Sequence, residues 1–546
     1  MTTLHISGNL VDCVQRTIAA SDITIEGGII VDIRQRAVGA EDSSLPYITP
    51  GFVDAHVHIE SSMLIPSEFA RLAVAHGTVA TVSDPHEIAN VCGLEGVRFM
   101  IENGKTVPFK CNFGAPSCVP ATIFETAGAE LTSDEVGSLL EMEEVRYLSE
   151  MMNFPGAIAG DGEVIKKICA ALALGKPVDG HAPGLSGEGL KTYVERGIST
   201  DHECFTIGEA REKLALGMKI LIREGSAAKN FDALVPLVDE SPEMVMFCSD
   251  DKHPDSLVLG HINDLCARAV ARGCDVFNVL RAACINPVEH YKLPVGTLRK
   301  GAPADLVVLE DLMSFRVRET YINGQKVAER GRSLIPRNAS PVVPLNRFEI
   351  DEIAPATLRY SADGQYSRPI IECIDGQLIT TKGSGAPLLI DDVWCADAQR
   401  DILKIVVVNR YAKAPVAIAF VRNFGLTEGA IASSVAHDSH NIVAVGVDDE
   451  SLARAINFII REKGGVSCVG KGKEQVLPLP IGGLMSGDDG YKVAEAYTSI
   501  DRAAKELGSK LSAPFMSLSF MALLVIPHVK LSDKGLFDGD VFSFYQ

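Results

Sequence analysis

The chain has 546 residues, 47% of them apolar, and this length and composition are typical of a globular protein with three or four domains. Its formal net charge of −20, without a Lys/Arg run, argues against a phosphate-backbone partner, so we expect no nucleic acid. The thirteen Cys form no Cys-x-x-Cys pair, and the N-terminus lacks a signal-peptide pattern. The longest apolar run, near 516–526, is too short to span a bilayer. We therefore expect a cytoplasmic protein with no membrane partner.

Short alternating apolar runs open the chain, at residues 4–6, 23–25 and 29–33, around a Gly27-Gly28 turn. This pattern is typical of hairpin strands. The same pattern returns after Pro294, at residues 304–309 and 317–327. We therefore predict one small β domain, built from residues 1–48 and 295–340, which flank a larger insert.

The insert, residues 49–294, alternates short apolar β runs with amphipathic helical segments. Eight candidate strands end near His58, Asp84, Gly114, Glu150, His181, His202, Glu224 and Asp250. Eight βα units in about 245 residues predict a (β/α)₈ TIM barrel, whose chemistry lies where strands end and βα loops begin. The alternative, an open doubly wound sheet, is disfavoured because no Gly-x-Gly-x-x-Gly turn follows the first strand.

The first strand of this barrel, residues 50–58, ends in His56-Val57-His58. Side chains alternate across a strand, so both imidazoles point to the same side. Two imidazoles on one rigid strand form half of a metal site, and the other ligands must come from elsewhere in the chain. A single strand-end His is more often structural, so the prediction depends on the other strand ends.

Those ends supply further metal-binding side chains. The complete candidate set is His56, His58, Glu150, His181, His202 and Asp250. Glu150, on the middle strand, could bridge two cations, with His56, His58 and Asp250 on one side and His181 and His202 on the other. We expect two divalent ions per chain; imidazole and carboxylate ligands without a thiolate suit Mn²⁺, our first expectation, and equally Fe²⁺ or Zn²⁺.

With these ligands in this order and a split β domain around them, the first 330 residues or so resemble the amidohydrolase superfamily. Longer strings resemble the adenine deaminase family, at residues 59–63, 84–91, 150–156, 179–184 and 436–441. The resemblance implies hydrolytic deamination of adenine to hypoxanthine and ammonia, in purine salvage, with a free purine base as the partner. It also implies a homo-oligomer, and we favour a dimer.

The predicted mechanism uses a hydroxide held by two divalent ions, because such ions lower the pKa of water to about 7. Asp250 could move the proton from this nucleophile to the leaving amino group, and Glu150 joins it as a catalytic candidate through the metals. Attack at C6 of a purine also requires a proton donor at N1. The candidates that contact substrate stand at the ends of strands two and seven: His86, Glu87, Arg223 and Glu224. Each has an alternative structural role, as a helix cap or an ion pair. His253 could also reach the site, although a surface role is at least as plausible.

The rest of the chain follows a Pro-containing boundary near residues 340–346. Strands at 370–374, 402–408, 415–421 and 441–447, with helices at 451–463 and 491–507, predict an α+β domain over 345–546. His437 and His440 precede one of these strands. They could close a loop over the barrel mouth, form a second metal site or cap a helix, and the family resemblance favours the loop.

Two other functions remain open. A cyclic-amide hydrolase of the same superfamily would more often carry a Lys at the position of Glu150. A non-catalytic scaffold with the same barrel would be expected to have lost at least one of the six ligands, and all six are present here.

Overall fold

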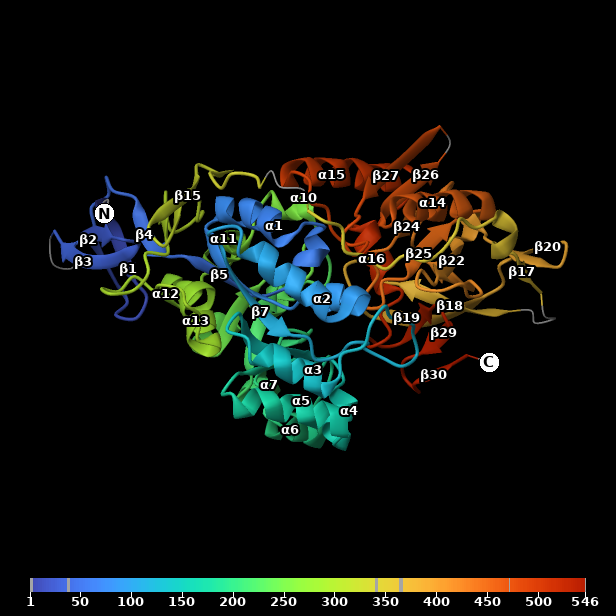
Figure 1. Ribbon diagram of the computed structural model, residues 1–546, viewed down its shortest axis with the longest axis horizontal. Coiled ribbons are helices and arrows are strands. Elements are labelled where there is room, and N and C mark those ends of the chain that lie inside the picture. Colours follow the sequence, from blue (N-terminus) through green and yellow to red (C-terminus); the bar gives the residue numbers. More distant parts are fainter. Residues whose placement is uncertain (1–2, 37–39, 339–341, 363–366, 471, 546) are drawn as a thin grey trace.

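The computed structural model describes residues 3–36, 40–338, 342–362, 367–470 and 472–545. The molecule is elongated, with a small β sheet at one end, a barrel in the middle and a C-terminal domain at the other end (Figure 1). Within the described ranges, no helix combines the length and apolar character that a membrane crossing requires.

The barrel forms from short, buried, largely β-branched or apolar runs. Its eight parallel strands are β5 (Phe52–Val57), β6 (Thr78–Ser83), β7 (Lys110–Ala115), β8 (Val145–Met151), β9 (Val178–Gly180), β10 (Thr200–Asp201), β11 (Lys219–Arg223) and β12 (Val245–Cys248). Bridges between Val178 and Ile198, and between Val57 and Asp250, join the five-stranded and three-stranded segments into a closed ring. The predicted TIM barrel and all eight predicted strand ends are thus confirmed.

Helices cover the outside of the barrel. The main ones are α1 (Pro66–Ala73), α2 (His86–Gly104), α3 (Ser133–Leu140), α5 (Gly162–Ala173), α6 (Gly187–Glu195), α7 (Ile207–Ala215), α8 (Phe231–Leu234), α9 (Leu237–Glu240), α11 (Ile262–Ala271) and α13 (Asn286–Tyr291). Side-chain caps fix several of their starts: Thr132 and Glu135 form a capping box at α3, and Asp161 accepts two backbone N–H groups at α5. These caps place each helix directly after a barrel loop.

The small β domain is one eight-stranded sheet with the order β16-β15-β14-β13-β4-β1-β2-β3. Its strands come from both flanks of the barrel, as predicted: β1 (Thr3–Asp12), β2 (Thr17–Glu26), β3 (Ile29–Gln35), β4 (Tyr47–Pro50), β13 (Leu306–Leu309), β14 (Val317–Ile322), β15 (Gln325–Glu329) and β16 (Arg332–Ser333). Gly51 joins β4 to the barrel strand β5. A Cβ at Gly51 would lie 2.3 Å from Cγ2 of Val79, so only glycine permits this close approach.

The C-terminal domain is α+β, as predicted. Its main sheet has the order β19-β18-β23-β22-β25-β24-β26-β27, with strands β18 (Arg368–Cys373), β19 (Thr380–Gly385), β22 (Ile402–Val408), β23 (Ala417–Arg422), β24 (Ala430–Ser433), β25 (Ile442–Gly446), β26 (Gly465–Gly470) and β27 (Lys473–Pro478). The helices are α14 (Asp449–Glu462), α15 (Gly490–Glu506) and α16 (Pro514–Phe520). Two small sheets complete it, β17-β21-β20 and β28-β29-β30. The start of the predicted boundary, with Ser340 and Pro341, lies outside the described residues, and the exact domain limits stay a prediction.

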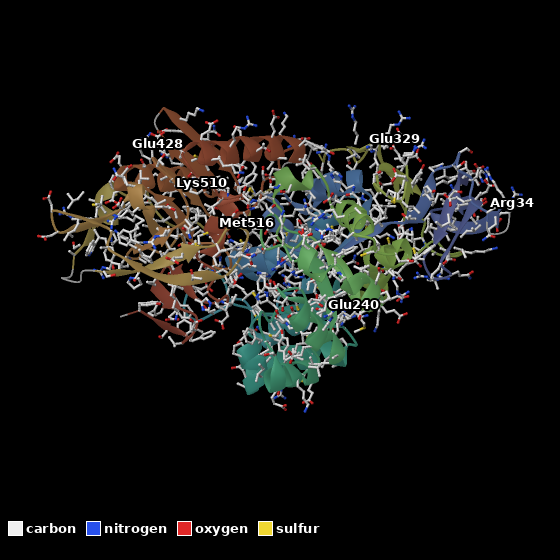
Figure 2. The ribbon with its side chains drawn as sticks, turned by 180° about the vertical axis from the view of Figure 1, so that it is seen from behind. Arg34, Glu240, Glu329, Glu428, Lys510 and Met516 are labelled. Carbon is white, nitrogen blue, oxygen red and sulfur yellow. The ribbon has the colours of Figure 1, made fainter. Side chains whose placement is uncertain are left out.

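The barrel and the C-terminal domain share one hydrophobic core. A continuous cluster of buried apolar side chains runs from Ile59 and Leu64 of the barrel to Phe515, Met516 and Leu523 of the C-terminal domain. Met516, on α16, lies where the ribbons of the two parts meet (Figure 2). The C-terminal domain therefore packs on the barrel through apolar surface that neither part could expose to water without a free-energy cost.

Candidate active site

The six predicted metal ligands meet at the carboxyl ends of the barrel strands. His56 and His58 lie at the end of β5, and their Nε2 atoms are 3.2 Å apart. Nε2 of His58 is 3.2 Å from Oδ1 of Asp250. The rings of His56 and His202 stack with their centroids 4.1 Å apart. All six residues are at most 5% exposed, so the cluster is almost closed to bulk water.

Glu150, at the end of β8, stands between the two groups of ligands. Its Oε1 lies 3.3 Å from Nε2 of His58. Its Oε2 lies 2.8 Å from Nδ1 of His181 and 3.1 Å from Nε2 of His202. Each carboxylate oxygen therefore faces a different half of the cluster, which is the arrangement that a bridging ligand requires.

Asp250 follows β12 with a backbone φ of +53°, in the left-handed region that non-glycine residues rarely adopt. Its N–H donates to the carbonyl of His56 at 2.9 Å, which fixes it beside β5. Its Oδ2 accepts from Nη1 of Arg223 at 2.6 Å, while Oδ1 faces the histidines. Arg223 also forms a buried fork with Glu203, with Nη2 3.1 Å from Oε2. One oxygen of Asp250 is thus held by Arg223 and the other is free for a cation or a proton.

The chemistry of these side chains fits divalent cations. Groups of three or four possible ligand atoms, all within 4.8 Å of one another, include His56 with His58 and Asp250, and His56 with Glu150 and His202. Nδ1 of His58 lies 3.2 Å from the carbonyl oxygen of Asp84, which can only accept, so Nδ1 carries the proton and Nε2 keeps a lone pair for a metal. Nδ1 of His56 and Nε2 of His181 have no hydrogen-bond partner. Buried ring nitrogens without a partner are costly, and the cost falls when a cation or a proton binds at the cluster.

Electrostatics in the cluster favour ionised carboxylates. Burial alone would raise the pKa of Glu150, but His181 and His202 lower it well below the usual value. Burial would likewise raise the pKa of Asp250, and Arg223 reverses the effect. Burial, together with His202 and His58, lowers the pKa of His56. Burial lowers the pKa of the other three histidines, but the neighbouring carboxylates, chiefly Asp250 at His58 and Glu150 at His181 and His202, raise it above the usual value. The site therefore offers two anions, one neutral imidazole and three imidazoles from which bound cations would displace a proton.

Above the cluster lies a small cavity of about 20 Å³. This volume holds about one water molecule, so a larger ligand enters only if side chains move apart. Barrel residues form the floor and walls, and the C-terminal domain supplies the roof with Leu378, His437, Asp438 and Leu523. The C-terminal domain is therefore part of the site.

Glu87, at the start of α2, links the barrel to this roof. Its two carboxylate oxygens contact Nδ1 of His437 and Nε2 of His440 through short hydrogen bonds. Burial would raise the pKa of Glu87, but His437 and then His86 lower it well below the usual value. Burial would lower the pKa of His437, but Asp251 and Glu87 raise it to about 9. The structure thus places residues 437–440 as a loop over the barrel mouth.

The four predicted substrate residues differ in position. His86, Glu87 and Arg223 line the cavity. Glu224 is not among its lining residues; its Oε1 pairs with Arg268 at 2.7 Å, away from the cluster. The surface alternative for His253 is wrong, because this side chain is buried and its Nδ1 lies 2.5 Å from the hydroxyl of Tyr497 on α15.

Several residues of the site had no predicted role. They are Met152, Glu203, Asp251, Leu378, Asp438 and Leu523. Glu203 directly follows His202, and Asp251 directly follows Asp250, so their proximity to predicted ligands was a usable signal. Leu378 and Leu523 are apolar residues of a distant domain, and nothing local in the sequence marks them.

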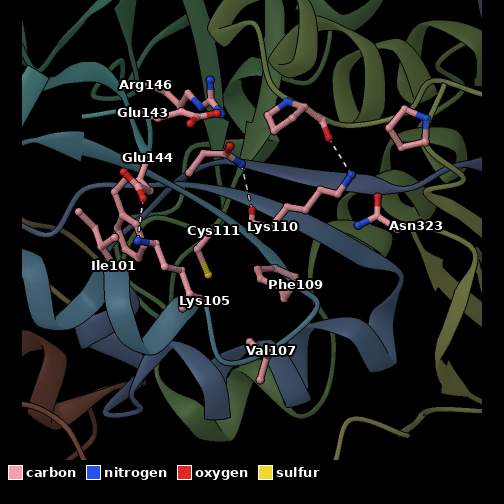
Figure 3. Close-up of a pocket in the computed structure, with 15 residues that line it drawn as sticks. Ile101, Lys105, Val107, Phe109, Lys110, Cys111, Glu143, Glu144, Arg146 and Asn323 are labelled. Atoms are coloured by element: carbon pink, nitrogen blue, oxygen red, sulfur yellow. Dashed lines mark hydrogen bonds and ion pairs between the residues drawn. The ribbon is translucent and has the colours of Figure 1, made fainter. Parts of the chain in front are cut away.

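A larger surface hollow, of about 530 Å³, lies at the opposite end of the barrel, where β7 and β8 begin (Figure 3). Lys110 pairs there with Asp305 at 2.6 Å, and Lys105 with Glu144 at 2.6 Å. None of the predicted site residues lines this hollow. In TIM barrels the chemistry belongs to the other rim, where the ligand cluster is found.

Comparison with known proteins agrees with this geometry. Residues 47–327 match the amidohydrolase family, and residues 377–543 match the adenine deaminase C-terminal domain. The chain is 56% identical to adenine deaminase of Salinibacter ruber over 544 residues, covering 99% of this chain and 98% of the relative. It is 53% identical to adenine deaminase of Sulfurovum sp., covering 99% of both chains, and 49% identical to that of Borreliella afzelii, covering 100% of both. The chain belongs to the adenine deaminase family. The matches to these relatives cover both the barrel and the C-terminal domain, so the domain that forms the roof is shared by the family.

Proposed function

We propose that this protein catalyses the hydrolytic deamination of adenine to hypoxanthine and ammonia, in purine salvage. The observation that carries the proposal is the buried cluster of four histidines and two carboxylates, closed by a C-terminal domain of the adenine deaminase type. The same cluster favours deamination over the alternatives, because the two oxygens of Glu150 face opposite halves of it, as a bridging ligand would, and all six candidate ligands are present.

The proposed cofactor is a pair of divalent cations, with Mn²⁺ first and Fe²⁺ or Zn²⁺ as alternatives. His56, His58 and Asp250 would hold one, His181 and His202 the other, and Glu150 both. Bound cations of this kind would activate water as a nucleophile at neutral pH, because they lower its pKa.

The side chains of the protein carry out the proton transfers. Asp250 takes the proton of the water that attacks C6 of adenine, because its Oδ1 faces the cluster while Arg223 holds Oδ2. The same carboxyl then gives this proton to the amino group as the C6–N6 bond breaks, and the proton left on the C6 hydroxyl returns to the group that protonated N1 as the C6 carbonyl forms. One water is consumed, and the products are hypoxanthine and ammonia.

Attack at C6 places charge on N1, which then needs a proton. His86 and Glu87 are the candidates we retain. Both ring nitrogens of His86 lack a hydrogen-bond partner, and Glu87 can pass on a proton received from His437. Arg223 is committed to Asp250 and Glu203, and Glu224 pairs with Arg268. His86→Asn and Glu87→Gln would separate the two candidates, because only loss of the true donor lowers kcat strongly while the ligand cluster is kept.

The test of the proposal is ammonia release from adenine, adenosine, guanine and dihydroorotate. The protein is first stripped of metal and then reloaded with Mn²⁺, Fe²⁺ or Zn²⁺. Metal-dependent turnover of adenine is the expected result. Turnover of dihydroorotate alone would support the cyclic-amide hydrolase, and no turnover with two metals bound would support the scaffold. Size-exclusion chromatography with light scattering tests the proposed dimer, and cell fractionation tests the proposed cytoplasmic location.

A further inference from the structure

The roof of the cavity carries two polar atoms without a hydrogen-bond partner. They are Nε2 of His437 and Oδ2 of Asp438, on side chains that are 3% and 2% exposed. Buried polar groups are normally paired, and an unpaired one at the lip of a cavity needs a partner from a ligand. We propose that these two neighbouring residues bind the N3/N9 edge of the purine and so restrict the enzyme to the free base. The inference rests on the proposed deamination of adenine.

The geometry of a purine supports this assignment. C6 and N3 occupy opposite corners of the six-membered ring, so a base with C6 at the ligand cluster turns its N3/N9 edge toward the roof. On that edge the free base offers an acceptor, N3, beside a donor, the N9–H group. The roof offers the complementary pair, a donor from His437 and an acceptor from Asp438.

The distance from floor to roof also fits a flat heterocycle. Nδ1 of His86 lies 3.6 Å from Oε1 of Glu150, and Nε2 of the same ring lies 3.5 Å from Oδ1 of Asp438. The imidazole ring of His86, with a contact at each end, therefore spans the distance between Glu150 in the ligand cluster and Asp438 in the roof. A purine standing beside or in place of that ring would reach from the cluster to the roof.

The donor on His437 is fixed by its other contacts. Its Nδ1 contacts the carboxylate of Glu87, and its backbone N–H donates to Oγ of Ser519 at 3.1 Å. Although burial opposes it, Asp251 and Glu87 raise the pKa of His437 to about 9, so the ring carries a proton on both nitrogens at neutral pH. Oδ1 of Asp251 lies 3.5 Å from Nε2 and makes no hydrogen bond with it, which leaves this N–H available to N3.

The same arrangement rejects substituents at N9. A ribose or methyl group there removes the N9–H donor and leaves Oδ2 of Asp438 buried without a hydrogen-bond partner. A site that hydrogen-bonds a substrate group discriminates strongly against analogues that lack it.

The experiment measures binding of the product hypoxanthine, so that differences in the reactivity of free and N9-substituted bases do not affect the result. Calorimetry compares hypoxanthine with 9-methylhypoxanthine on the metal-loaded full chain, as wild type, Asp438→Asn and the control Ser439→Ala. Ser439 is the neighbouring loop residue and does not line the cavity. Wild type and Ser439→Ala are expected to prefer hypoxanthine by roughly 10- to 100-fold, the worth of a hydrogen bond to a charged group, and Asp438→Asn to lose most of this preference.

Equal binding of hypoxanthine and 9-methylhypoxanthine to wild type overturns the inference, whether or not the Asp438→Asn variant folds. A preference in Asp438→Asn as large as in wild type removes Asp438 from recognition. The proposed function fails separately, if metal-loaded wild type neither deaminates adenine nor binds hypoxanthine. For His437, 3-deazahypoxanthine, which lacks the N3 acceptor, is expected to bind wild type roughly tenfold more weakly than hypoxanthine, and equal binding would exclude the N3 contact.

Discussion

Replacing Arg223 by Met should destabilise the barrel strongly and stop turnover. Arg223 is 1% exposed, and its guanidinium donates to Asp250 at 2.6 Å, to Glu203 at 3.1 Å and, through Nε, to the carbonyl of Ala228 at 2.8 Å. Removing one partner of a buried ion pair costs about 3–5 kcal/mol, because the other charge stays buried and unpaired. For a unit of the barrel's size this corresponds to a fall in melting temperature of about 10 °C.

The assay is thermal unfolding followed by circular dichroism, together with ammonia release. The chain offers a matched control in Arg211→Met, because Arg211 makes the same forked contact to Glu240, at 3.0 and 2.7 Å, but on the surface. Surface ion pairs contribute little, so this variant should melt close to wild type. A double variant, Arg223→Met with Glu203→Gln, should recover part of the loss, because one of the two stranded carboxylates is then neutral. If Arg223→Met has the same melting temperature as Arg211→Met and keeps full activity, Arg223 neither stabilises these carboxylates nor positions Asp250.

Three further perturbations test other parts of the structure. Glu150→Gln should bind fewer than two metal ions per chain by elemental analysis and lose turnover with an unchanged circular dichroism spectrum; full activity would remove Glu150 from the mechanism. Deleting residues 345–546 should give insoluble protein, because it exposes the shared apolar core, and a soluble, active truncation would contradict this. Lys530 is buried, and burial lowers the pKa of its amine from 10.5 to about 7. The unfolded chain holds this proton up to about pH 10.5 and the folded chain releases it near pH 7, so stability should rise with pH between these values, by at most about 1.4 kcal/mol per pH unit. Lys530→Met should abolish this part of the rise in melting temperature between pH 7 and 9, and equal slopes for both proteins would show that Lys530 does not titrate in this window.

The barrel and its ligand cluster were predictable because they depend on local patterns. The alternation of buried strands and amphipathic helices fixes eight strand ends, and parallel strands in a closed ring bring those ends to one rim. Strand periodicity alone places His56 and His58 on the same side. Arg223 and Glu224 could not both face the cluster, because neighbouring side chains at a strand end point to opposite sides, and the pattern does not say which of them does. In the structure Arg223 faces Asp250, and Glu224 turns away toward Arg268.

Contacts across domains were out of reach of the sequence pattern. Glu87 and His437 are 350 residues apart, and nothing in either local sequence indicates that they meet. For His253 the sequence left a surface role at least as plausible as a role in the site, yet α15 of the C-terminal domain covers it through Tyr497. In both cases the missing information was the packing of the C-terminal domain on the barrel mouth, which is set by a shared apolar core and leaves no periodic signal in the barrel sequence.

The need for a C-terminal domain of about 200 residues follows from the charges it covers. Glu87 is 1% exposed, and without His437 and His440 its ionised carboxylate would face a heavy desolvation cost. In the barrel alone, water would have to solvate the Glu87 carboxylate. Water at the barrel mouth would also weaken every electrostatic contact to the substrate. The domain excludes this water with Leu378 and Leu523, and it adds Asp438 to the cavity. It also balances the charge of Glu87 with His437, whose pKa is raised, and gives Glu87 a hydrogen bond from His440. A barrel with an intact metal cluster but a displaced roof should accordingly keep its two cations and lose its affinity for purines, which separates metal binding, a property of the barrel, from substrate recognition, a property of the two domains together.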